Sequence, residues 1–300
     1  MVSLHDRAMG CIIGGAIGDY IGSALEGLAG PLEVGIPSAS RITDDTQLTL
    51  ATCEGILEVG RLEPEAIARS FARWFEQGRI SGIGSSTLKA LRDLSFGAHW
   101  AIAGATGERS AGNGAAMRIA PLAFCVDPLS DGGRLEIRDI CSITHKHEEA
   151  FCGALAIAVA IALPGLDYLP AIMSCLPDCR TRDRLAELSA EAAASIADLG
   201  CRFGASGYVV ESVPLALVAA SRAGAMGFQD AVFSTISCGG DTDTTGSMVG
   251  QIVGSKVGLS GIPEELRSLP FGEENVTRIA QKFADFVCTN RNCDERPTDS

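Results

Sequence analysis

Two short acidic clusters, almost two hundred residues apart, are the part of this sequence best equipped for chemistry. The first is TDDT at residues 43–46, and the second is GGDTDTTG at residues 239–246. Each places two carboxylates and several hydroxyls within a few residues. Carboxylates held together repel one another and lose hydration, which costs free energy unless a cation is present. Oxygen-only ligands suit a hard ion such as Mg²⁺, Mn²⁺ or Ca²⁺, so the two clusters together predict a site for two ions with shared carboxylates.

A plainer interpretation stays open for each cluster, because Thr and Asp are also preferred N-caps of helices. Asp44 and Asp45 stand where a predicted loop enters a helix. Asp241 and Asp243 face the same choice before another predicted helix, which begins near Asp243. Capping uses one side chain and leaves the others unexplained. The preceding Gly239-Gly240 allows a tight turn and a close approach of the backbone to a ligand.

The elements expected to position these clusters are all helices. Hydrophobic residues make up 46% of the chain, but aromatics only 5%, and there are 35 glycines. This composition favours closely approaching helices over a β-sandwich. Within residues 7–27 a glycine recurs at every fourth position, at Gly10, Gly14, Gly18 and Gly22. Such a stripe predicts a helix on which another helix can lie closely, and this packing must offset about 1 kcal/mol of helix stability lost per glycine.

Hydrophobic periodicity and capping signals predict a succession of further helices in one all-α, compact multi-helix domain over residues 1–287. The expected helical ranges are 44–59, 63–77, 84–93, 114–124, 133–142, 147–163, 168–175, 181–199, 209–223, 227–237, 243–258, 263–269 and 273–287. No strand–helix alternation with a glycine-rich phosphate loop is present. The polar residues 288–300 are expected to form a disordered tail.

Composition also excludes several function classes. A net charge of −13 disfavours nucleic-acid binding, which relies on Lys and Arg against phosphate. Eleven cysteines are scattered without a framework, which is typical of free thiols in a reducing compartment. No segment is apolar for long enough to span a bilayer, and the N-terminal apolar run is interrupted by glycines and Asp19. We therefore expect a cytoplasmic monomer without nucleic-acid or membrane partners.

Five motifs in a fixed order resemble those of a known family. They are GCIIGGAIGDYIGSALEG, TDDT, GNGAAMR, ITHKHEEA and GGDTDTTG, and they lie between about Arg7 and Gly258. Together they resemble the ADP-ribosylglycohydrolases, which include the dinitrogenase reductase-activating glycohydrolase and the ADP-ribosylarginine and ADP-ribosylserine hydrolases. The resemblance implies an all-α fold, two divalent ions, Mg²⁺ or Mn²⁺, and hydrolysis of the bond between ADP-ribose and an acceptor.

By this resemblance both acidic clusters supply metal ligands, namely Thr43, Asp44, Asp45, Asp241, Asp243 and Thr244. The resemblance also makes Glu26, at the end of the first motif, a general acid/base that faces the ribose. Hydrolysis at an anomeric carbon needs an acid for the leaving group and a base for water. Two questions stay open: whether Glu26 is only a solvated carboxylate at a helix end, and whether Glu26 or a metal-bound Asp44 or Asp45 carries the main proton transfer.

Three further segments are expected to bind the substrate. Small residues before a helix expose N–H groups that favour anions, and the resemblance assigns Gly112, Asn113 and Gly114 to the diphosphate and the neighbouring ribose. It places His145 by the ligand. It also places Ser206, Gly207 and Tyr208 beside the adenosine, where the tyrosine could stack on adenine. The plainer alternatives are a glycine turn with an Asn cap, a structural histidine and a core tyrosine.

The sequence therefore predicts a metal-dependent hydrolase that releases ADP-ribose from a modified side chain, with arginine preferred as the acceptor. Its expected partners are ADP-ribose and an ADP-ribosylated protein. Serine-linked and O-acetyl-ADP-ribose are alternative substrates. A non-catalytic member that binds ADP-ribose or has a structural role is the alternative of another class.

Overall fold

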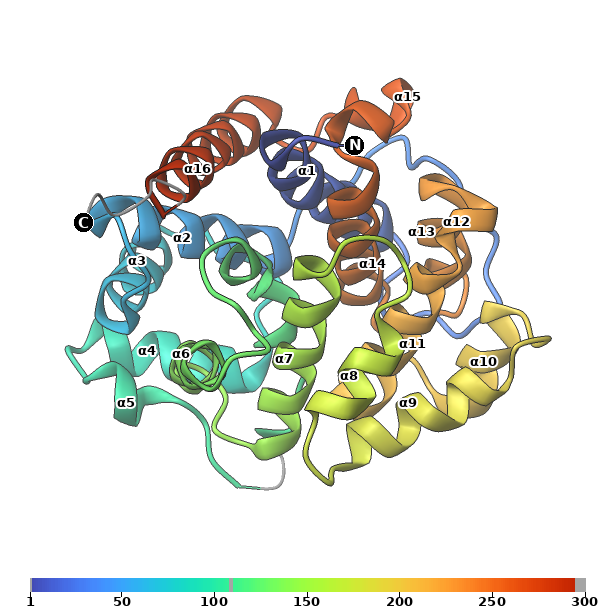
Figure 1. The fold of residues 1–300 in the computed structure, drawn as a ribbon, viewed down its shortest axis with the longest axis horizontal. Helices are drawn as coiled ribbons and strands as arrows, with labels where there is room; N and C mark the ends of the chain where they lie inside the picture. The colour runs from blue at the N-terminus through green and yellow to red at the C-terminus, as the bar shows by residue number, and fades with distance from the viewer. Residues whose placement is uncertain (1, 108–109, 295–300) are drawn as a thin grey trace, which may run out of the picture.

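The computed structural model describes residues 2–107 and 110–294. At its centre α1 (Leu4–Gly22) and α14 (Thr242–Val257) lie side by side (Figure 1). A Cβ added at Gly14 would lie 2.4 Å from the carbonyl oxygen of Gly250, which shows that the two backbones touch. The glycines face each other in antiparallel order: Gly10 with Gly254, Gly14 with Gly250 and Gly18 with Gly246. The predicted glycine stripe is thus a helix-packing seam.

The remaining helices surround this pair. α2, α3 and α16 lie on one side of the seam, and α11 and α13 lie on the other (Figure 1). In chain order the other elements are α2 (Asp44–Val59), α3 (Pro64–Glu76), α4 (Ser85–Ser95), α5 (Trp100–Ala103), η2 (Ala116–Arg118), η3 (Ala120–Phe124), α6 (Asp131–Ser142), α7 (Glu148–Ala162), α8 (Leu169–Cys175), α9 (Arg180–Ala190), α10 (Ile196–Phe203), α11 (Val209–Ser221), α12 (Ala223–Met226), α13 (Phe228–Ile236), η4 (Leu259–Gly261), α15 (Glu264–Arg267) and α16 (Glu273–Asp294).

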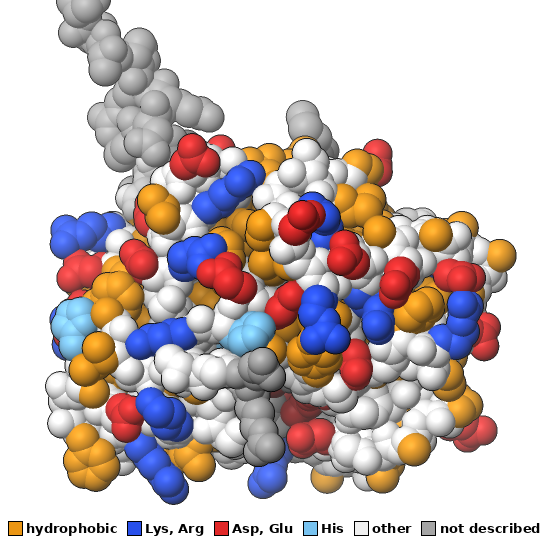
Figure 2. Space-filling view, turned by 90° about the horizontal axis from the view of Figure 1, so that it is seen from below, with side chains coloured by type: hydrophobic (Ala, Val, Ile, Leu, Met, Phe, Trp, Pro, Cys, Tyr) orange, Lys and Arg blue, Asp and Glu red, His pale blue; other side chains and the backbone are white. Residues whose placement is uncertain are grey.

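The expected all-α architecture in one domain is confirmed, since the described residues contain only isolated β-bridges and no strand. No helix within 2–107 and 110–294 is both long enough and apolar enough to cross a membrane. The face in Figure 2 carries Lys and Arg interspersed with Asp and Glu, without a continuous basic surface.

Three predicted elements differ from the structure. The single helix expected over 181–199 is two helices, because a capping box at Ser195 starts α10. The helix expected over 114–124 is two 3₁₀ turns, since Pro121 has no N–H to continue an α-helix. The disordered tail expected over 288–300 is wrong for residues 288–294, because α16, anchored by buried Val287, continues to Asp294. Residues 295–300 lie outside the described part of the chain.

Candidate active site

A cleft of about 480 Å³ brings the two acidic clusters together with three loops. Of the residues expected at a site, those that line it are Glu26, Asp44, Asp45, Gly112, Asn113, Gly114, His145, Ser206, Gly207, Asp241, Asp243 and Thr244. Thr43 lies behind the wall of the cleft, and Tyr208 is half-buried beside it with Arg180 over its ring at 5.9 Å. The structure therefore gathers most of the expected residues in one place.

Backbone hydrogen bonds fix the turn that carries Glu26 to the second acidic cluster. The N–H of Gly27 donates to the carbonyl of Gly240 at 2.8 Å, and the N–H of Gly240 donates to the carbonyl of Leu28 at 2.8 Å. Both glycines have positive φ, 78° and 76°, a conformation that favours glycine. Glu26 itself lies on the turn after α1, and its side chain is exposed at the cleft. Its carboxylate is therefore held in place through the backbone while it stays open to solvent.

The start of α2 is held by Asp19, a residue of α1 for which the sequence predicted no role at the site. Its fully buried carboxylate accepts hydrogen bonds from the N–H and hydroxyl groups of both Thr43 and Thr46. Burial raises the pKa of Asp19 to about 6, although these four donors counteract the rise. Thr43 is also the N-cap of α2, so the capping interpretation holds for this residue. Asp19 thereby fixes the position of Asp44 and Asp45.

The carboxylates in the cleft are buried near one another. Desolvation and then the charge of Asp241 raise the pKa of Asp243 to about 9. Desolvation and then Asp243 raise the pKa of Asp45 well above its usual range. Desolvation and then Asp19 do the same for the pKa of Asp44. Without a counter-ion this arrangement is electrostatically unfavourable, since each carboxylate disfavours the ionisation of the next.

The start of α14 differs from that of α2. Asp241 stands at its N-cap position but makes no side-chain capping bond, so the capping interpretation fails there. Instead Asp241 Oδ2 accepts a hydrogen bond of 2.7 Å from Asn113 Nδ2. Asn113 Nδ2 is also 3.1 Å from the hydroxyl of Ser212. The amide of Asn113 therefore orients a carboxylate of the second cluster.

The donor set of the cleft fits a hard divalent ion. Asp45 Oδ1 is buried without a hydrogen-bond partner among the described residues. Asp45 Oδ2 lies 3.2 Å from the hydroxyl of Thr244, which joins the two clusters. No three His, Cys, Asp or Glu side chains within the described ranges form a ready-made ligand group. An ion here would therefore need threonine hydroxyls, water or substrate oxygens to complete its coordination.

A helix start that the sequence analysis did not single out forms a further part of the cleft wall. The wall residues belong to the segment GIGSST over 82–87, which begins α4. Gly84 is the N-cap of this 11-residue helix and offers no side chain to the exposed N–H groups. A helix N-terminus of this kind is favourable for an anion. The glycine-rich run before Ser85 was the available signal for it.

The Gly112–Gly114 loop adjoins α4 in the cleft wall, since a Cβ at Gly114 would lie 3.1 Å from Thr87 Oγ1. It does not open an α-helix, so its expected helix-dipole contribution is absent. The loop is joined to the 206–208 segment by hydrogen bonds from Asn113 N–H to the carbonyl of Gly207 (3.1 Å) and from Val209 N–H to the carbonyl of Ala111 (3.1 Å). Its glycines leave room for the His145 ring, which would lie 2.7 Å from a Cβ at Gly114.

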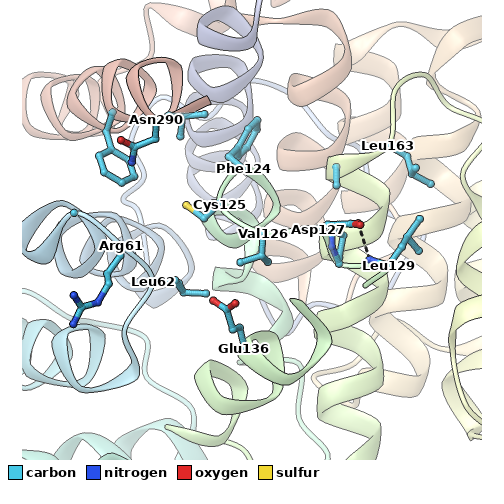
Figure 3. A pocket seen from close by; sticks show the side chains of 15 residues that line it. Arg61, Leu62, Phe124, Cys125, Val126, Asp127, Leu129, Glu136, Leu163 and Asn290 are labelled. Carbon is cyan, nitrogen blue, oxygen red and sulfur yellow. Dashed lines mark hydrogen bonds between the residues drawn. The ribbon is translucent and has the colours of Figure 1, made fainter. Parts of the chain in front are cut away.

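A second, larger cavity of about 830 Å³ lies between the ends of α2, α7 and α16 and the loop after η3 (Figure 3). Apolar side chains such as Leu62, Phe124 and Leu163 line much of it. Two of its charged side chains are engaged in local structure: Asp127 accepts from Leu129 N–H at 3.0 Å, and Arg61 pairs with Glu63 at 2.6 Å. This cavity has volume, but its described lining holds no cluster of carboxylates.

Comparison with known proteins gives consistent results over nearly the whole chain. A family model described as ADP-ribosylglycohydrolase matches residues 1–292. The ADP-ribosylarginine hydrolase Tri1 of Pseudomonas putida is 28% identical over 301 residues, covering 93% of this chain and 78% of that protein. The ADP-ribosyl-[dinitrogen reductase] glycohydrolase of Rhodospirillum rubrum is 27% identical over 280 residues, covering 87% and 89%. A solved "ADP-ribosylglycohydrolase-related protein complex" matches with a TM-score of 0.70 at 25% identity, covering 96% of this chain and all of that one.

Proposed function

This chain belongs to the ADP-ribosylglycohydrolase family and is an enzyme of that type, and we propose that it is a divalent-metal-dependent hydrolase that releases ADP-ribose from modified arginine. One observation carries the proposal: Asp44, Asp45 and Asp243 are buried together in one cleft, and one Asp45 oxygen has no hydrogen-bond partner in the described part of the chain. A chain gains nothing in stability from such a group, so its arrangement points to a bound cation and chemistry.

Two Mg²⁺ or Mn²⁺ ions, with Thr43, Asp44, Asp45, Asp241, Asp243 and Thr244 as the candidate ligands, would supply Lewis-acid charge beside the ribose. The chain's own residues supply the proton transfers. Water gives a proton to a base and adds its oxygen to the anomeric carbon while the bond to the acceptor nitrogen breaks, and the leaving nitrogen takes up a proton from an acid. Glu26 is our candidate for this acid/base step, because it lies at the solvent side of the cleft beside the carboxylate cluster.

We place the diphosphate of ADP-ribose in the cleft against the start of α4 and the adjoining Gly112–Gly114 loop. Both offer backbone N–H groups, and α4 adds the positive end of its dipole. Backbone donors allow a protein of net charge −13 to hold an anion without a basic surface. Ser206 and Gly207, at the end of the cleft next to Tyr208, are our candidates for the adenosine side.

Arginine is our preferred acceptor for two reasons. One relative at 28% identity is named an ADP-ribosylarginine hydrolase. A guanidinium leaving group is also cationic, which complements a cleft rich in carboxylates. The ADP-ribose would come from a modified protein, and we propose that the enzyme acts as a monomer in the cytoplasm, where free cysteines like those of this chain persist.

The test is release of ADP-ribose from arginine-, serine- and ester-linked substrates with Mg²⁺, Mn²⁺ or EDTA. We expect fastest release from the arginine linkage and loss of activity in EDTA that either metal restores. Faster release from serine or an ester would overturn the acceptor assignment alone. If ADP-ribose is released from none of the three linkages with metal present, the proposed activity is contradicted.

A further inference from the structure

Arg118, the last residue of GNGAAMR, is fully buried, and no carboxylate of the described residues pairs with it. One amino group of its guanidinium donates to the carbonyl of Ile140 at 3.2 Å and to the hydroxyl of Thr144 at 2.7 Å. Its Nε and the other amino group have no hydrogen-bond partner in the described ranges. The guanidinium also lies over the ring of Phe71 at 4.8 Å. Burial of a cation in this way is costly, which calls for an explanation beyond packing.

The bond to Thr144 determines where the hydroxyl proton goes. A guanidinium can only donate, so Thr144 Oγ1 must accept from Arg118. The hydroxyl still has one proton to give, and His145 Nδ1 lies 2.9 Å away. Thr144 is fully buried, and no described residue offers its hydroxyl another acceptor. The alternative, a proton on Nδ1, would leave a buried hydroxyl proton unbonded, which costs about 1–3 kcal/mol.

The positive charge of Arg118 also favours a neutral His145 ring. Burial, and then this nearby cation, lower the pKa of His145 to about 3. The imidazole is therefore neutral near pH 7 and carries one proton. With Nδ1 as the acceptor, that proton is on Nε2.

Nε2 lies on the side of the ring that faces the Gly112–Gly114 loop. A Cβ at Gly112 would lie 3.4 Å from Nε2, and one at Gly114 would lie 3.2 Å from it. His145 lines the cleft, and among the described residues none is hydrogen-bonded to its Nε2. Side chains at these two positions would cover the nitrogen, whereas glycines leave it accessible to a ligand.

We infer that Arg118 and Thr144 are positioning residues that hold His145 in its Nε2–H form, so that the imidazole is an obligate hydrogen-bond donor to an oxygen of the ADP-ribosyl substrate. The inference rests on the proposed function for the identity of that oxygen. The chain of hydrogen bonds from the guanidinium to the hydroxyl to Nδ1 is a property of the free protein, so it can be tested without substrate.

The first experiment measures the protonation of the imidazole nitrogens by ¹⁵N NMR in the free, full-length protein. The chain has four histidines, and the His145→Gln variant assigns the signal. We expect a protonated Nε2 and a bare Nδ1 for His145 in the wild type. Thr144→Val keeps the shape but removes the hydroxyl, so we expect a mixture of tautomers, and Thr144→Ser should restore the wild-type form. A wild-type proton on Nδ1, or an unchanged tautomer in Thr144→Val, would overturn the inference.

The second experiment measures binding of ADP-ribose by calorimetry and hydrolysis by steady-state kinetics. Thr144→Val should weaken binding and raise KM by about tenfold with kcat nearly unchanged, because a donor to a charged ligand is lost. Thr144→Ser should restore both. If Thr144 had only a structural role, Thr144→Val would lower the melting temperature but would change neither the tautomer nor KM relative to kcat. If the tautomer behaves as expected but the wild type binds no ADP-ribose, the proposed function is wrong, whereas the hydrogen-bond chain that fixes the tautomer is supported.

Discussion

The acidic cleft and the larger cavity differ in what their polar groups are bonded to. In the cavity of about 830 Å³, Asp127 bonds its own loop and Arg61 pairs with Glu63. In the cleft of about 480 Å³, Asp45 keeps a buried oxygen to which no described residue is hydrogen-bonded, and Asp243 is buried near it. Volume alone would identify the larger cavity as the functional site. Unsatisfied and mutually repelling carboxylates identify the smaller cleft instead, because a protein keeps such groups where they serve a ligand.

The largest difference between the acidic cleft and the larger cavity is expected for Asp243→Asn. This variant keeps the shape but removes a carboxylate from the cluster, and we expect hydrolysis to fall by at least about 100-fold, since a metal site stabilises the transition state by several kcal/mol. In EDTA at pH 7 the same variant should melt at a higher temperature than the wild type. Wild-type Asp243, whose pKa is raised to about 9 in the cluster, must take up a proton on folding, and asparagine needs none. Initial rates, metal content and melting curves measure these effects.

The matched control is Asp127→Asn in the larger cavity, which should leave activity and metal content unchanged. Wild-type activity in Asp243→Asn, or an equal loss in the control, would remove the distinction between the two sites.

The next largest effect is expected for Glu26→Gln. General acid/base catalysis contributes about 10²–10⁴-fold, so we expect kcat to fall by about 100-fold or more. Metal content and melting temperature should not change, because the side chain is exposed and its turn is held by the backbone of Gly27 and Gly240. A variant with wild-type kcat would transfer the acid/base role to a carboxylate inside the cluster.

The same contrast explains what the sequence could predict. Both acidic clusters and the glycine stripe are local patterns whose residue types imply their own chemistry or packing. The structure brings TDDT and GGDTDTTG into one cleft, as expected. The stripe on α1 meets glycines of α14, a partner that spacing alone did not identify.

The roles that were missed depend on distant partners. Asp19 looked like a lone acid that interrupts an apolar run, but its donors lie 24 and 27 residues further on. Asn113 was expected to contact the ligand, yet its amide bonds Asp241, 128 residues away. Such contacts depend on how helices pack, which no local pattern contains. The start of α4 is different, because its run of glycine and serine was a readable signal.

A smaller effect, on stability, is expected for Gly250→Ala in the seam. A Cβ here would lie 2.0 Å from the carbonyl oxygen of Gly14, so backbone must move, and overpacking typically costs about 1–3 kcal/mol. Helix α14 carries Asp243 and Thr244 of the acidic cleft, and α1 carries Asp19, which holds the start of α2. Neither helix lines the larger cavity. Urea unfolding should show the loss, and activity near the melting temperature should fall with it.

Gly132→Ala in α6 is the matched control. No atom lies within 4 Å of its added Cβ, so the helix should gain up to about 1 kcal/mol. A seam variant as stable as the wild type would show that close glycine packing is not what holds α1 against α14.

The smallest effect is expected for Glu136→Gln, the counterpart of Glu26→Gln. Both glutamates are exposed, each lines one of the two hollows, and the Glu136 carboxylate points into the larger cavity (Figure 3). The two substitutions remove the same charge from the same side chain, so any general effect of charge on folding or solubility appears in both. We expect Glu136→Gln to keep kcat and KM within about twofold of the wild type, as exposed substitutions away from a site usually cost less than about 0.5 kcal/mol. A loss comparable to that of Glu26→Gln would mean that the larger cavity also takes part in the reaction. An unpartnered carboxylate would then no longer distinguish the acidic cleft from the larger cavity.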